Sequence, residues 1–263
     1  MLVAVGALLV FLGLPLLSLL IRVPPGELWA RLVQPASLTA LRLSLVTSVA
    51  ALAAVIILGL PTAYLLATQR FRGHHVLEAL VELPMVLPPT VAGVGLLLAF
   101  GRAGLAGRAL AVFGLSIPFT TLAVILAQLF VSCPFFIAAA TAGLREVEPR
   151  YVDAAATLRA RPGHTFRRVL LPLAFPSVLA GAAMSWARAL GEFGATIMFA
   201  GNLPGKTQTL PLAVYMGLQT DLQSAVTLSV VLMILSFTVL LGLRFAHRFP
   251  HAPWIARAPG DGR

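Results

Sequence analysis

Residues 43–67 read LSLVTSVAALAAVIILGLPTAYLLA, 25 consecutive residues without a charged side chain. A helix needs about 20 mostly apolar residues to cross the hydrocarbon core of a bilayer. Its backbone polar groups are all bonded within the helix, which suits a medium without water. The stretch therefore predicts a transmembrane helix, and it sets the fold class of the whole chain.

Five further stretches have a similar length and character. The predicted spans are 2–21, 43–67, 83–101, 118–143, 170–200 and 222–243. The stretch 103–117 is apolar but short and interrupted by glycine, which fits a re-entrant or interfacial helix, so five or seven spans remain alternatives. We predict an all-α polytopic membrane protein with about six transmembrane helices and a single domain over residues 1–263.

The first span has the apolar core of a signal peptide but lacks its other marks. No basic residue precedes it, and no small-residue cleavage pattern follows directly after it. We expect a membrane anchor that is retained.

The composition excludes the soluble alternatives. Of the 263 residues, 59% are hydrophobic and only 11% are charged, whereas a soluble domain has about a quarter charged residues. The single cysteine, Cys133, allows no intrachain disulfide and no cysteine-based metal site. His74 and His75 are expected to be solvated loop residues, so we predict no bound metal.

The basic residues predict the orientation in the membrane. With six spans, one side carries Arg70, Arg72, Arg145, Arg150, Arg159, Arg161, Arg167, Arg168, Arg244, Arg248, Arg257 and Arg263. The other side carries Arg22, Arg31, Arg102, Arg108 and Lys206. Because basic residues concentrate in cytoplasmic loops, both termini and the loop 144–169 are predicted to be cytoplasmic. The net charge of +10 is therefore a topology signal, and no nucleic-acid partner is expected.

The loop 144–169 is the longest polar stretch of the chain. Glu148 and Pro149 favour a helix start, residues 151–160 are rich in helix formers, and Pro162-Gly163 is expected to end that helix. A second short helix is predicted over 164–170. The small side chains favour either a helix lying on the lipid surface or one that lets another protein approach closely.

This loop also contains a spaced motif. It consists of Asp153, Ala154, Ala155, Gly163, Val169, Leu171 and Pro172. The motif resembles the cytoplasmic EAA loop of the permease subunits of binding-protein-dependent ABC importers. Arg159 departs from that pattern, because the family usually has glycine there, and Pro162-Gly163 is the candidate to supply the turn instead. The resemblance implies that Asp153, Ala154, Ala155, Arg159, Gly163 and Pro172 belong to the loop that couples the permease to its ATPase.

Further strings extend the resemblance over residues 40–240. They are GLPTAYLL at 59–66, ELPMVLPPTVAGVGLL at 82–97, RALGEFGAT at 188–196 and GNLPGKTQTLPLAVY at 201–215. These strings are similar to the molybdate/sulfate permease family, and the last is closest to its molybdate branch.

This resemblance implies an importer subunit for a tetrahedral oxyanion, in the plasma membrane of a bacterium or archaeon. It further implies a homodimer, two cytoplasmic ATPase subunits that bind ATP and magnesium, and an extracytoplasmic oxyanion-binding protein. Molybdate is favoured over sulfate, whereas the residues do not separate molybdate from tungstate.

The chain itself carries no ATP-binding motif. Gly205-Lys206-Thr207 ends like a phosphate-binding loop, but Ala200 stands where that loop needs a glycine. We therefore expect a transport subunit that is not an enzyme and binds no cofactor itself. The alternatives are a secondary anion transporter or channel that works without an ATPase, and a membrane-anchored assembly subunit without a transport role.

Arg188 and Glu192 are the charges inside a predicted span, one helical turn apart. Ionisable groups at membrane depth usually face a bundle interior or a water-filled cavity. With Gly191 and Gly194, they could line the anion pathway or its gate, and the alternative is an ion pair with a structural role only.

Proline and glycine interrupt another predicted span. Pro84, Pro88, Pro89 and Gly93 are candidate hinges that let the halves of the transporter rock. The alternative is the ordinary tolerance of these residues in membrane helices.

Overall fold

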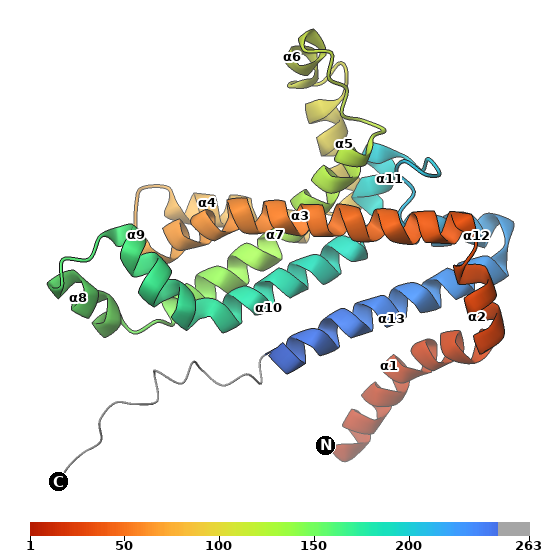
Figure 1. Cartoon of the computed structure of the whole chain (residues 1–263), viewed down its shortest axis with the longest axis horizontal. Helices are drawn as coiled ribbons and strands as arrows, with labels where there is room; N and C mark the ends of the chain where they lie inside the picture. The colour runs from red at the N-terminus through yellow and green to blue at the C-terminus, as the bar shows by residue number, and fades with distance from the viewer. Residues whose placement is uncertain (247–263) are drawn as a thin grey trace.

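The computed structural model describes residues 1–246, and this part of the chain is helical without a strand (Figure 1). The helices are α1 (Leu2–Arg22), α2 (Pro25–Leu32), α3 (Pro35–Thr68), α4 (His74–Val86), α5 (Pro89–Phe100), α6 (Gly107–Val112), α7 (Thr121–Arg145), α8 (Pro149–Thr157), α9 (Pro162–Thr165), the π-helical η1 (Phe166–Leu170), α10 (Leu171–Leu190), α11 (Gly194–Ala200), α12 (Leu210–Thr220) and α13 (Leu222–Ala246). Five helical segments within the described residues are long and apolar enough to cross a membrane, or six if the bent pair α4–α5 is one span. The all-α polytopic prediction is confirmed.

Helix α7 forms the centre of the bundle, between α3 and α10 (Figure 1). Phe136, Ile137 and Ala140 of α7 pack with Val55 of α3 and Val178 of α10 in the main apolar core. In a membrane the hydrophobic effect does not drive two helices together, so their association depends on close packing.

Small residues allow that close approach. A Cβ added to Gly181 of α10 would lie 2.9 Å from Cβ of Ala139. One added to Gly143 of α7 would lie 2.2 Å from Cβ of Ser177. Backbones that approach this closely gain van der Waals contact, which holds α7 and α10 together.

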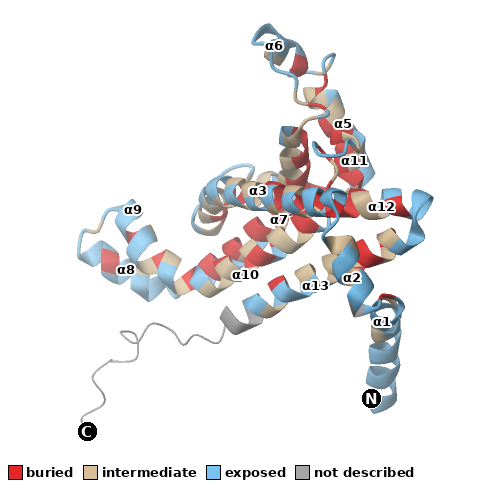
Figure 2. Ribbon diagram, turned by 45° about the vertical axis from the view of Figure 1, so that its right-hand side comes forward, coloured by how far each residue is buried: buried red, intermediate tan, exposed pale blue. Residues whose placement is uncertain are grey.

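A second core joins α5 and α11 to the N-terminal half of α7. It contains Ala92 and Leu96 of α5, Ala127 of α7, and Ala195 and Phe199 of α11. Helix α5 projects away from the long helices with α11 packed beside it, and α6 lies beyond its end (Figures 1 and 2).

Helix α1 stands apart from the core. None of its residues is buried, and Figure 2 shows it exposed along its length. Helix α2 is tied to the start of α13, because Nη1 of Arg31 lies 2.7 Å from Oδ2 of Asp221 and also donates to Ser224. The apolar surface of α1 is therefore available to lipid or to another protein.

The structure differs from the predicted span 83–101. A helix already begins at His74, and α4 meets α5 at an angle of 116°. The break falls at Leu87 and Pro88, where the backbone is extended. Proline lacks a backbone N–H and disfavours a helical residue before it, so two consecutive prolines end α4 and start α5.

The structure also differs from the predicted span 170–200. The helix stops at Leu190, and a separate helix, α11, begins at Gly194. The stretch 103–117 contains only the short helix α6. Of the predicted cytoplasmic arginines, Arg248, Arg257 and Arg263 lie outside the described residues.

Candidate coupling and translocation sites

Helix α8 is the candidate coupling helix. Pro149 occupies its first turn, where a missing N–H costs nothing, as the sequence predicted. Val152 packs against the main core, and Ala155, 9% exposed, is also turned inward. Tyr151, Ala154 and Leu158 lie on the exposed face, which borders an open groove, and Leu158 is 83% exposed there. The helix therefore holds to the bundle by one face and presents small and apolar side chains on the other.

The turn after α8 is made by Arg159, which has a φ of +53°. The Arg159 N–H donates to the Ala156 carbonyl over 2.9 Å, and the Ala160 N–H donates to the Ala155 carbonyl over 3.0 Å. This pair of bonds is the Schellman arrangement, which usually places glycine at the left-handed position. A residue with a side chain costs about 1 kcal/mol or more there.

The predicted turn at Pro162-Gly163 is wrong. Pro162 begins α9, and Gly163 lies inside that helix with nothing within 4 Å of an added Cβ. The predicted second helix at 164–170 begins earlier, at Pro162, and runs through η1 into α10, with Pro172 in the first turn of α10. Arg159 makes the turn itself, at the position where the motif has glycine.

The inward orientation of Ala155 changes its expected role. A larger side chain there would first disturb the packing of α8 on its own chain, because little of Ala155 is exposed. Asp153 and Ala154 are exposed, so a partner can reach them directly.

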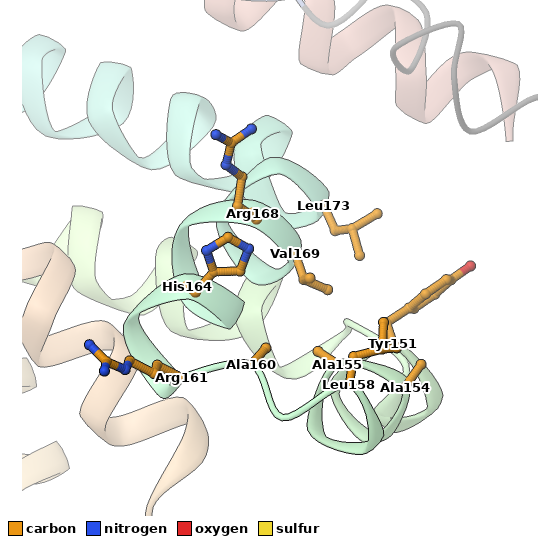
Figure 3. A pocket seen from close by; sticks show the side chains of 10 residues that line it. All are labelled: Tyr151, Ala154, Ala155, Leu158, Ala160, Arg161, His164, Arg168, Val169 and Leu173. Carbon is orange, nitrogen blue, oxygen red and sulfur yellow. The ribbon is translucent and has the colours of Figure 1, made fainter.

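A groove of about 870 Å³ separates α8 from the helix that follows it. Figure 3 shows Tyr151, Ala154 and Leu158 on the α8 side, facing Val169 and Leu173 on the other. The remaining lining residues are Ala155, Ala160, Arg161, His164 and Arg168. The groove is thus apolar at its centre and basic along the α9–η1 side.

Arg145, the last residue of α7, fixes the end of the bundle from which α8 extends. Its Nη2 donates to Oε1 of Glu78 on α4 over 2.6 Å and to the Leu66 carbonyl on α3 over 3.0 Å. His74 lies beside this contact, with Nε2 3.4 Å from Oε1 of Glu78, so its prediction as a solvated loop residue is wrong. Sequence reasoning missed this contact, because 67 residues separate Arg145 from Glu78.

Arg188 and Glu192 form the expected ion pair at the end of α10. Nη2 of Arg188 lies 2.7 Å from Oε2 of Glu192, although the two do not align as a hydrogen bond. The Glu192 side chain is 1% exposed and that of Arg188 is 27% exposed. Oε1 of Glu192 accepts the Ala195 N–H over 2.8 Å. Glu192 therefore caps α11 as well, a role that the spacing of the charges did not reveal.

Pro89, Gly93 and Gly194 meet where α11 packs on α5. A Cβ on Gly194 would lie 2.9 Å from Cβ of Pro89, and one on Gly93 would lie 2.7 Å from the Ala195 carbonyl oxygen. Both glycines thus act in close packing. Pro88 and Pro89 lie at the break between α4 and α5, whereas Pro84 is buried within α4 and Gly191 is exposed at the end of α10.

Buried polar atoms occur in the helices that meet near this break. Oε1 of Gln128, Oγ of Ser132 and Oγ1 of Thr196 are buried without a hydrogen-bond partner in the chain. Such atoms are rare in helices at membrane depth unless water or a transported polar group reaches them. Among the described residues, no group of histidine, cysteine and carboxylate side chains is arranged to hold a metal ion.

Solved structures with a similar fold include membrane subunits of ABC transporters. The chain is similar to a bacterial ABC transporter involved in the import of the acidic polysaccharide alginate, with a TM-score of 0.74, 15% identity, and coverage of 93% of this chain and 92% of that one. It is also similar to the MetNI methionine ABC transporter, with a TM-score of 0.66, 20% identity, and coverage of 82% and 96%. At these identities the likeness concerns the fold.

Sequence relatives are considerably more similar. The molybdenum transport system permease protein ModB of Mycobacterium tuberculosis is 46% identical over 235 residues, which are 89% of each chain. The sulfate transport system permease protein CysT of Salmonella typhimurium is 35% identical over 219 residues, 83% of this chain and 79% of the relative. Residues 56–247 match the family described as the inner membrane component of binding-protein-dependent transport systems. The chain therefore belongs to this family of transport-system membrane components.

Proposed function

We propose that this chain is the membrane subunit of an ATP-driven importer of molybdate. The observation that carries the proposal is the 46% identity to a molybdenum permease over 89% of both chains, against 35% to a sulfate permease. Molybdate, tungstate and sulfate share shape and charge, so the permease discriminates little among them. Selection by an extracytoplasmic oxyanion-binding protein fits this arrangement.

The ATPase subunit transmits the energy of ATP hydrolysis to this chain through α8. This subunit, with ATP and magnesium, docks on the exposed face made by Tyr151, Ala154 and Leu158, with Asp153 and Arg159 at its edges. Ala155 supports the helix from inside, while Gly163 and Pro172 belong to the continuous helix that carries force into α10. This reading is supported by the exposed face of α8 and by the likeness to ABC importer structures.

The anion passes beside Arg188. Its partly exposed guanidinium supplies positive potential, while Glu192 keeps that potential from holding an anion too tightly, since conduction needs binding weak enough to permit exit. The unpartnered polar atoms of Gln128, Ser132 and Thr196 support a polar path nearby. Gly191 is exposed at the corner between α10 and α11, and Gly194 lets α11 pack against α5.

Transport alternates between two states as α4 and α5 rock about Pro88 and Pro89. Gly93 keeps α11 in contact during this movement, and Pro84 loosens the helix that leads into the break. The working unit is a homodimer in the plasma membrane, with both termini and α8 in the cytoplasm. This orientation follows from the asymmetry of the basic residues.

Uptake by whole cells tests the proposal. A strain without its own molybdate importer receives this chain with the cognate ATPase and binding protein, and molybdenum accumulation is measured. We expect accumulation that an excess of sulfate barely reduces and that disappears when the phosphate-binding lysine of the ATPase is replaced. Accumulation that survives the loss of ATP hydrolysis would instead support a secondary transporter or channel.

A further inference from the structure

Arg159 is the strained residue at the tip of the segment after α8. Only Phe119 shares its positive φ among the described residues that are not glycine. The φ of Phe119, +61°, has a reason within the chain, because its ring packs on Gly201 and its N–H faces the Phe199 carbonyl. Arg159 is exposed, and its side chain fills no such space.

The guanidinium of Arg159 makes no hydrogen bond or ion pair within the described part of the chain, unlike that of its neighbour Arg150, which pairs with Glu148 over 2.7 Å. The two backbone bonds of the Schellman turn and the general attraction of a cation to a helix carboxyl end favour this conformation, but no contact of the Arg159 side chain adds to them. Residues with a strained backbone cluster at functional sites, such as places where a side chain binds a partner.

The location of Arg159 selects the kind of partner. It directly follows Leu158, the C-cap residue of α8, which is 83% exposed. In Figure 1, α8 and the connection to α9 lie beyond the ends of α3, α7 and α10, so the segment that contains Arg159 extends past the spanning helices. A protein docked on α8 would meet this segment directly.

We infer that Arg159 pairs with a carboxylate of the ATPase subunit and thereby contributes to selecting the cognate ATPase. The inference rests on the proposed docking of the ATPase at α8. A charge at the rim of an interface affects the association rate and its salt dependence more than the packing at the centre. Leu158 and Ala154 supply the apolar contact, and Arg159 supplies the charge complementarity.

Substitutions separate charge from strain. Arg159→Gly removes both the charge and the backbone strain, whereas Arg159→Lys keeps both. As a control, Arg70→Gln removes an exposed cation from the loop that follows α3. Binding of the purified ATPase subunit to the detergent-solubilised permease is measured at low and high salt, first without added lipid and then with anionic lipid. Unfolding temperature of the permease is measured in parallel.

For Arg159→Gly we expect binding weaker by about fivefold at low salt, as for a single exposed ion pair. The difference should vanish at high salt, because salt screens such pairs. The unfolding temperature should rise by about 2 °C as the strain is released. Arg159→Lys and Arg70→Gln should both bind like the unchanged chain.

Undiminished binding of Arg159→Gly would overturn the inference. It would also be overturned by an effect that appears only after anionic lipid is added, since the partner would then be a lipid phosphate. Ala154→Arg separates this failure from failure of the proposed function, because it blocks the centre of the docking face. If Ala154→Arg binds normally, ATPase docking at α8 is itself wrong.

Discussion

The corner between α10 and α11 allows a quantitative test of the buried ion pair. The appropriate substitutions are Arg188→Gln and Glu192→Gln, singly and together. Glutamine at 192 keeps an acceptor for the Ala195 N–H, whereas leucine would remove the cap as well as the charge. The two single variants and the double variant then report on the charges alone.

The burial of the two side chains sets the expected magnitudes. Arg188→Gln leaves a carboxylate that is 1% exposed without its cation, which costs about 3 kcal/mol when one partner of a buried pair is lost. Glu192→Gln leaves Arg188, whose side chain is 27% exposed and thus less buried than Glu192, so the cost is about 1–2 kcal/mol. The double variant should lose only about 1 kcal/mol, giving a coupling on the order of 3 kcal/mol.

Unfolding temperature in detergent measures the loss of stability, and molybdate uptake in proteoliposomes measures the effect on transport. We expect the double variant to recover most of its stability while uptake stays low, because the positive potential beside the path is gone. Additive losses of stability would refute a coupled pair. Recovered stability with full uptake would reduce Arg188 and Glu192 to a structural role and remove them from the anion path.

Three further predictions concern other contacts. Gly93→Ala places a Cβ 2.7 Å from a carbonyl oxygen of α11, and such overpacking should destabilise the chain by about 1–3 kcal/mol in thermal unfolding. Glu78→Gln weakens the contact to Arg145 that fixes the base of α8, so ATP hydrolysis should persist while uptake per ATP falls, and an unchanged ratio would count against this role. The Ser224 hydroxyl and the Arg31 guanidinium lower the pKa of Asp221 from 3.8 to about 2. The folded state therefore favours the carboxylate, so Asp221→Asn should lower the unfolding temperature at neutral pH, by a difference that shrinks as the pH falls from about 4 to about 2.

Much of the fold could be predicted from hydropathy alone. Span 43–67 lies within α3, and α7 covers all of span 118–143 except its first three residues, because long apolar runs have one stable form in a membrane. The corner after Leu190 could not be predicted from hydropathy, because residues 190–194 are as apolar as their neighbours except for Glu192. That break depends on a side chain that replaces a backbone carbonyl as acceptor for Ala195.

The candidate site was predictable in its position but not in its details. Spacing from Asp153 to Pro172 located α8 and its turn, yet it favoured Gly163 for the conformation that Arg159 adopts. Glycine is usual at such a turn, so the sequence indicated Gly163 instead of Arg159. The contact of Arg145 with Glu78 lay beyond reach, because no local pattern relates two residues on different helices.

Purified components test the central claim most directly. The chain, its ATPase and its binding protein are reconstituted in proteoliposomes, with the binding protein and molybdate on one side and ATP on the other. We expect ATP-dependent accumulation of molybdate against its gradient, and none with Ala154→Arg, whose folded yield should match that of the unchanged chain. Accumulation without ATP, or undiminished accumulation with Ala154→Arg, would contradict an importer driven by an ATPase docked on α8.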